Sequence, residues 1–107
     1  MKILPIILFK IVFASVNVNW YSYLSNNSIE LKAISKNIES LNGIEIFKQL
    51  KSIDLSLNKI KLINQLEHLS SLESPILSNN QIKQINSLHN LTSLQLLYLA
   101  NNQIKEY

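Results

Sequence analysis

The sequence of 107 residues contains no cysteine, no arginine and only one glycine, and these absences remove whole classes of function. Without cysteine the chain has no disulfide cap, no thiol nucleophile and no zinc–cysteine site. Gly43 alone cannot build a glycine-rich phosphate loop. The two histidines, His68 and His89, have no paired carboxylates set to meet them. We therefore expect a protein that is not an enzyme and that carries no cofactor and no metal.

The chain also has only a small net charge. Ten lysines stand against seven acidic residues, which gives a formal net charge of +3. The lysines are interleaved with glutamate and aspartate along the chain, and no basic block with aromatic residues appears. This distribution predicts no nucleic-acid partner.

What the chain does have is a period of twenty-two residues. Asn58, Asn80 and Asn102 are spaced by that interval, and their neighbours fall into columns. In each case a leucine stands three positions before the asparagine and an isoleucine two positions after it. The period and the L-x-x-L-x-L-x-x-N-x-L pattern are typical of a solenoid built from leucine-rich repeats.

The columns extend upstream, where Lys36 stands in the asparagine position. The segment 38–55 resembles the opening repeat of the 22-residue leucine-rich class, which occurs in bacterial internalin-like surface proteins and in the leucine-rich regulatory subunit of protein phosphatase 1. The resemblance implies an α/β-type solenoid: a right-handed superhelix with a short parallel β-sheet on its concave face and 3₁₀ or irregular return arms. It covers residues 29–107, with one degraded repeat and three clear ones, the last of them incomplete.

Each repeat is expected to begin with a short strand, at about 29–33, 52–56, 74–78 and 96–100. The apolar residues between strands recur every three positions, which suits a 3₁₀ return arm with one edge inward. Pro75 falls in a strand position and can donate no ladder hydrogen bond, so we expect a local cost there.

We interpret the three asparagines as structural. Where the chain leaves a strand, backbone groups turn inward and need partners. An amide side chain donates and accepts at once, so Asn58, Asn80 and Asn102 are expected to form a ladder between adjacent turns.

Function is expected on the concave face, where the side chains between framework positions point outward. This face is charged and small toward the N-terminus and apolar toward the C-terminus, and a tyrosine among aliphatic groups suits contact with a protein. The predicted partner-binding residues are Asp54, Ser56, Ile76, Ser78, Leu96 and Tyr98.

The leading hypothesis is thus a non-catalytic protein–protein interaction module, part of a longer array. Two alternatives stay open: a purely structural repeat segment, or the recognition domain of a larger enzyme or regulatory subunit. The chain stops inside a return arm without a polar capping repeat, so an open apolar row drawn from Leu91, Leu94, Leu97, Leu99 and Ile104 is expected, with possible end-to-end contact there.

Residues 1–28 lie outside the repeats and are interpreted as an apolar leader or a cap. Residues 1–14 resemble a signal peptide, although Lys10 interrupts the apolar run. The run is shorter than the roughly twenty residues of a membrane-spanning helix, so no span is predicted. A signal peptide would place the protein outside the cell or on its surface, and otherwise it would be cytoplasmic. Residues 17–28 are interpreted as a linker or an irregular cap edge, with Trp20 packed on the first repeat.

Overall fold

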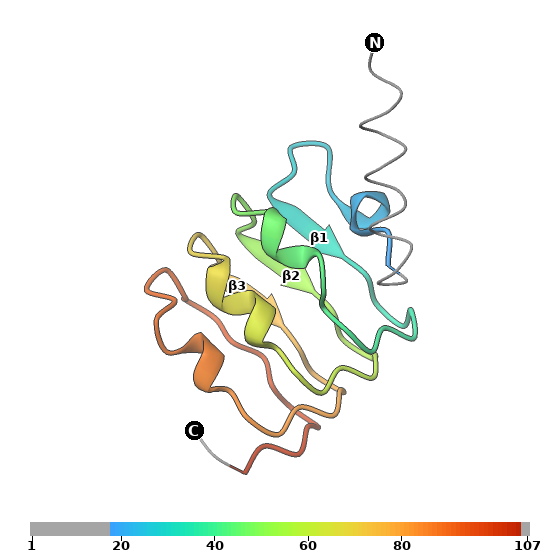
Figure 1. The fold of residues 1–107 in the computed structure, drawn as a ribbon, viewed down its shortest axis with the longest axis vertical. Coiled ribbons are helices and arrows are strands. Elements are labelled where there is room, and N and C mark those ends of the chain that lie inside the picture. The colour runs from blue at the N-terminus through green and yellow to red at the C-terminus, as the bar shows by residue number, and fades with distance from the viewer. Residues whose placement is uncertain (1–17, 106–107) are drawn as a thin grey trace.

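A computed structural model describes residues 18–105 of the chain. The signal-peptide interpretation of residues 1–14 therefore falls outside the described residues, as do the last two positions. The described chain winds in successive turns, each contributing a strand to one parallel sheet (Figure 1). The strands are β1 (Glu30–Lys32), β2 (Ser52–Asp54) and β3 (Ser74–Ile76), in the order β1-β2-β3. Their register follows the period, because Glu30 pairs with Ser52 and Ser52 with Ser74.

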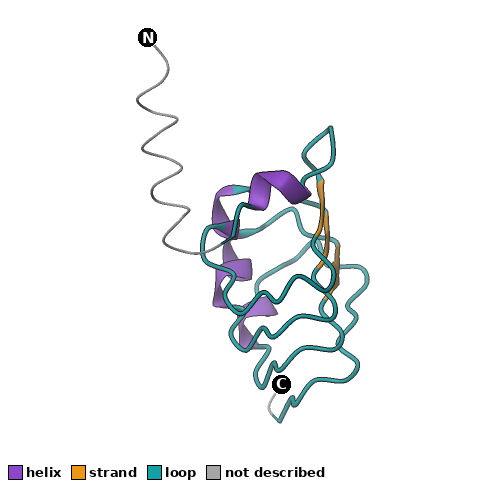
Figure 2. Ribbon diagram, turned by 90° about the vertical axis from the view of Figure 1, so that its right-hand side faces the viewer, coloured by secondary structure: helices purple, strands orange, loops and turns teal. Residues whose placement is uncertain are grey.

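The return arms contain short 3₁₀ helices. These are η2 (Ile44–Ile46), η3 (Asn64–His68) and η4 (Asn86–Leu88), and they lie on the opposite side of the stack from the strands (Figure 2). Residues three apart eclipse one another in a 3₁₀ helix, so the three-residue apolar period buries one edge. Leu41, Ile44, Phe47 and Leu50 are all buried accordingly. The structure thus has the short parallel sheet and 3₁₀ turns that the sequence predicts, and residues 18–105 contain no α-helix.

The fourth predicted strand, at 96–100, is wrong: only an isolated parallel bridge between Ile76 and Tyr98 forms there. Between turns, a backbone N–H donates to the carbonyl twenty-one positions on, as in Leu55 to Ile76 and Leu77 to Tyr98, both at 2.9 Å. By the same spacing of twenty-one residues, the backbone nitrogen of Pro75 corresponds to the carbonyl of Leu96. Since proline has no N–H, the sheet loses a hydrogen bond at this point and strand pairing stops at one bridge.

The core consists of apolar rows that run from turn to turn. Each framework column contributes a leucine, isoleucine or alanine that is nearly inaccessible to solvent, for example Ala33, Leu55 and Leu77. The apolar rows are less well covered at the last turn. There, Leu94, Leu99 and Ile104 are only partly buried and Leu97 is 39% exposed. Leu91 is buried, so the prediction of an exposed row fails at that residue.

The first turn is covered by residues 18–24, which include the 3₁₀ helix η1 (Trp20–Tyr23). Trp20 is fully buried, and its indole Nε1–H donates to the backbone oxygen of Asn42 at 2.9 Å. Leu24 adds an antiparallel bridge to Leu31. This segment therefore packs on the solenoid instead of forming a linker. Over residues 18–105, no helix has the length and apolar character needed to cross a bilayer.

Candidate functional site

The outer face of the sheet carries the residues that lie between buried framework positions. Side chains alternate between the two faces of a strand, so each strand buries its middle residue and turns its flanking residues outward. The register aligns them in rows: Ser52 with Ser74, and Lys32 with Asp54 and then Ile76. The Ile76–Tyr98 bridge continues the second row. We call this surface, together with Leu96, Ser56 and Ser78, the sheet face.

At the charged end of the sheet face, Asp54 bonds to a neighbour on its own turn. Its carboxylate Oδ1 accepts hydrogen bonds from the Ser56 hydroxyl at 2.7 Å and from the Ser56 backbone N–H at 3.1 Å. Lys32 is the register partner of Asp54, but the two side chains form no ion pair within the described chain. Asp54 is therefore fixed in position with part of its carboxylate still free to accept.

The other end of the sheet face is apolar. Leu96 is 52% exposed and Tyr98 is 47% exposed. Ile76 lies directly beside Tyr98 through the bridge, and it is half-buried. These three residues form one apolar cluster with a phenolic hydroxyl, which combines a rigid amphipathic side chain with aliphatic neighbours.

Ser56 and Ser78 occupy equivalent positions in successive turns, and they support the backbone as well as the surface. The carbonyl oxygen of Ser78 accepts from the backbone N–H of Leu57 at 3.1 Å. Ser56 is held by Asp54, and both serines are half-buried. The structure thus places all six predicted partner-binding residues at or beside one sheet.

The asparagine side chains point inward at the turn after each strand. The Asn58 amide donates to the carbonyls of Ala33 and Leu55, both at 2.8 Å, and its oxygen accepts from the N–H of Ile38 at 3.0 Å. Asn80 and Asn102 repeat these contacts one and two turns later. Each side chain bridges its own turn and the one before it.

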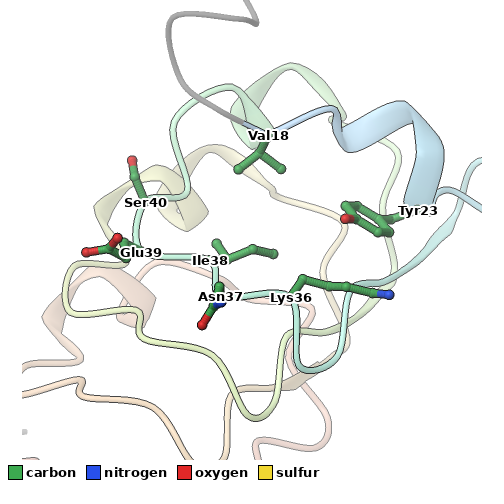
Figure 3. Close-up of a pocket in the computed structure, with 7 residues that line it drawn as sticks. All are labelled: Val18, Tyr23, Lys36, Asn37, Ile38, Glu39 and Ser40. Carbon is green, nitrogen blue, oxygen red and sulfur yellow. The ribbon is translucent and has the colours of Figure 1, made fainter.

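A small hollow that sequence reasoning missed lies at the N-terminal end of the solenoid. Its volume is about 140 Å³, and Figure 3 shows Val18 and Tyr23 on one side of it and the loop 36–40 on the other. The Lys36 Nζ lies 6.0 Å from the centre of the Tyr23 ring. The hollow is smaller than the roughly 300 Å³ at which pockets begin to enclose a drug-sized ligand.

The histidines stay apart from the sheet face. His68 ends η3, and its Nε2 lies 3.5 Å from the carboxylate of Glu67, with both side chains about half exposed. His89 follows η4 and is exposed. Across residues 18–105, no group of three His, Cys, Asp or Glu side chains is arranged to hold a metal ion.

Comparison with solved structures identifies the fold as leucine-rich-repeat-like. The chain is similar to an internalin from Listeria monocytogenes, with 32% sequence identity and a TM-score of 0.69. The match covers 72% of this chain but 23% of the internalin chain, so it spans less than a quarter of that protein. Neither a protein-family model nor a curated protein sequence matches this chain.

Proposed function

We propose that this chain is a non-catalytic module that binds a protein partner through the sheet face. The observation that carries the proposal is the apolar cluster of Ile76, Leu96 and Tyr98, in which Leu96 and Tyr98 are about half exposed and Ile76 is half-buried. Ile76 lies in β3, where a side chain cannot turn to the other face without a shift of register, and the bridge to Ile76 sets Tyr98 beside it.

The energetics of the sheet face suit a protein partner. Tyrosine buries a large area with few rotatable bonds, and such residues dominate binding where they sit at the centre of an interface. Asp54, Ser56 and Ser78 supply polar groups beside the cluster. The likeness to an internalin of the same fold supports a protein-interaction repeat module in general terms, and the partner is left open.

The test uses a photo-crosslinking amino acid at position 98 to capture the partner, followed by affinity measurements with that purified partner. Leu96→Ser combined with Tyr98→Ser is expected to weaken binding roughly thirtyfold or more, the loss typical of a hot spot worth at least 2 kcal/mol. Melting temperature should stay close to that of the wild type because both side chains are largely exposed. Ile46→Ser is the matched control, since Ile46 is 45% exposed on η2, away from the sheet. Equal affinity of the double variant and the wild type would refute the proposal.

A structural role is the second candidate, and one observation favours it. Leu97 is 39% exposed, whereas Ile53, its equivalent two turns earlier, is almost fully buried. A further repeat, in this chain or another, would cover that row. In this case a crosslinker at position 97 captures the neighbouring repeat, and one at position 98 captures nothing. The recognition domain of a larger enzyme is a third possibility, which the sequence of the whole reading frame decides.

A further inference from the structure

The solenoid gathers on one edge lysines that are interleaved with acidic residues in the sequence. The loops that follow β1, β2 and β3 lie side by side along this edge (Figure 1). From the second turn onward, the loop residues 58–62, 80–84 and 102–106 contain four lysines and one acidic residue, Glu106, and in the first turn Glu39 occupies the column of Lys61. We call these four, Lys59, Lys61, Lys83 and Lys105, the lysine edge.

The lysine edge is continuous. Lys61, Lys83 and Lys105 occupy one column of the repeat, and the backbone N–H of Lys105 donates directly to the carbonyl of Lys83 at 3.1 Å. The preceding residues are joined in the same way, Gln81 to Ile60 and Gln103 to Ile82, both at 2.9 Å. Successive turns of a parallel stack lie about 5 Å apart, so like charges stand beside one another along the edge.

These lysines are exposed and form no ion pair within the described residues. Like charges placed opposite each other on adjacent strands destabilise a fold slightly. A row that keeps this excess of positive charge attracts an extended negative surface.

We propose that the lysine edge docks the protein on a lipid bilayer that carries anionic headgroups. Leu62 stands next to Lys61 and is 72% exposed, the most exposed large apolar side chain of the described residues. A basic surface that also presents an exposed aliphatic side chain matches the bilayer interface, where lysines meet headgroups and apolar groups reach the acyl boundary.

Other polyanions fit this edge less well. Single-stranded nucleic acid is held by aromatic stacking and arginine contacts, but the three loops contain no aromatic residue and the chain contains no arginine. An extended acidic peptide repeats its same-side residues about every 6.7 Å, which does not match a lysine spacing near 5 Å. A bilayer requires no fixed spacing, because its headgroups move laterally. The lysine edge is separate from the sheet face, so this proposal stands or falls independently of the protein partner.

The experiment is sedimentation of the full chain with phosphatidylcholine vesicles, with and without phosphatidylserine. Each lysine near an anionic membrane contributes roughly fivefold in binding, that is about 1 kcal/mol. The triple variant Lys61→Gln, Lys83→Gln, Lys105→Gln is therefore expected to bind the phosphatidylserine vesicles about 100-fold more weakly. The matched control is Lys32→Gln, Lys48→Gln, Lys51→Gln, which removes the same charge from exposed positions elsewhere. It is expected to lose no more than about threefold, because charges farther from the membrane than the Debye length of ~10 Å are screened.

Further variants and competing ligands separate binding to the bilayer from binding to other polyanions. All variants retain residues 1–17, so any membrane affinity of that segment is common to them. Leu62→Ser should reduce the binding that survives high salt, since an apolar contact is not screened. The proposal is overturned if both triple variants lose binding equally, or if neither does. It is also overturned if the chain prefers poly-glutamate or single-stranded DNA to the anionic vesicles through the same three lysines.

Discussion

The side-chain oxygen of Asn80 accepts a hydrogen bond from the backbone N–H of Ile60, on the preceding turn, at 3.0 Å. The amide nitrogen of the same side chain donates to the carbonyls of Leu55 and Leu77 at 3.0 and 3.1 Å. One side chain thus bonds three backbone groups in the interior of the stack, and of these the carbonyls of Leu55 and Leu77 also accept from Asn58 and Asn102. A buried polar group without a partner costs about 1–3 kcal/mol, so this position is sensitive to substitution.

Asn80→Ala should therefore lower the free energy of unfolding by roughly 2–4 kcal/mol, and the melting temperature by about 10 °C or more. Asn102→Ala should cost about 1 kcal/mol, because Asn102 is only half-buried and water reaches its partners. Asn80→Asp keeps an acceptor for Ile60 but turns a carboxylate toward two carbonyls, so it should also destabilise. Denaturant unfolding of the three variants provides the measurement. An unchanged melting temperature for Asn80→Ala would show that the bridge contributes nothing to stability.

Leu57 adopts a left-handed backbone conformation, with φ of 59°. The equivalent residues one and two turns later are Asn79 and Asn101, with φ of 60° and 59°. This conformation costs most L-residues about 1–2 kcal/mol, whereas asparagine tolerates it. Leu57 gains little by burial in return, because it is 54% exposed.

Leu57→Asn should consequently raise the free energy of unfolding by about 1 kcal/mol. The reverse exchange, Asn79→Leu, is the matched control and should lower it by a similar amount. Both are measured by thermal and denaturant unfolding of the full chain. A loss of stability in Leu57→Asn would mean that the exposed leucine makes packing contacts worth more than the backbone strain.

Pro75 interrupts the sheet on the side that faces the last turn. Pro75→Val restores an N–H opposite the carbonyl of Leu96, so we expect a protected amide at position 75 and an extended fourth strand. The stability should change by no more than about 1 kcal/mol, because the new hydrogen bond offsets the loss of the proline's conformational restriction. Hydrogen exchange followed by NMR measures the protection. Exchange at the rate of an exposed amide would contradict the hydrogen-bonding scheme.

The period of twenty-two residues was sufficient to predict the parallel sheet and the 3₁₀ return arms, because both follow directly from stacking identical apolar columns. The period was not sufficient to predict how a residue in one turn affects the structure of the next turn. Pro75 is spaced normally in its own repeat, but its missing donor shortens the strand of the following repeat.

The lysine edge escaped sequence reasoning for a similar reason. Lys61 and Lys83 are separated in the chain by Glu67 and Glu73, and although the period aligns Lys61, Lys83 and Lys105, the structure is needed to show that these lysines are exposed and unpaired on one edge. The hollow beside Tyr23 depends on the placement of residues outside the period, and no columnar pattern encodes it.

Trp20 joins the N-terminal segment to the first turn, and its removal should show how far the repeats depend on that cover. Its side chain is fully buried, and its indole donates to the Asn42 carbonyl. Trp20→Phe should cost about 2 kcal/mol, from one lost hydrogen bond and a small cavity, and Trp20→Ala about 3–5 kcal/mol. Tyr21→Ala is the comparison from the same 3₁₀ helix, because Tyr21 is 49% exposed, whereas Trp20 is fully buried. Trp20 is the single tryptophan of the chain, so tryptophan fluorescence measures the burial of this residue alone. Its emission should be blue-shifted and poorly quenched by acrylamide until the solenoid unfolds. Full quenching in the native protein, or equal stability of Trp20→Ala and the wild type, would show that the repeats fold without this cover.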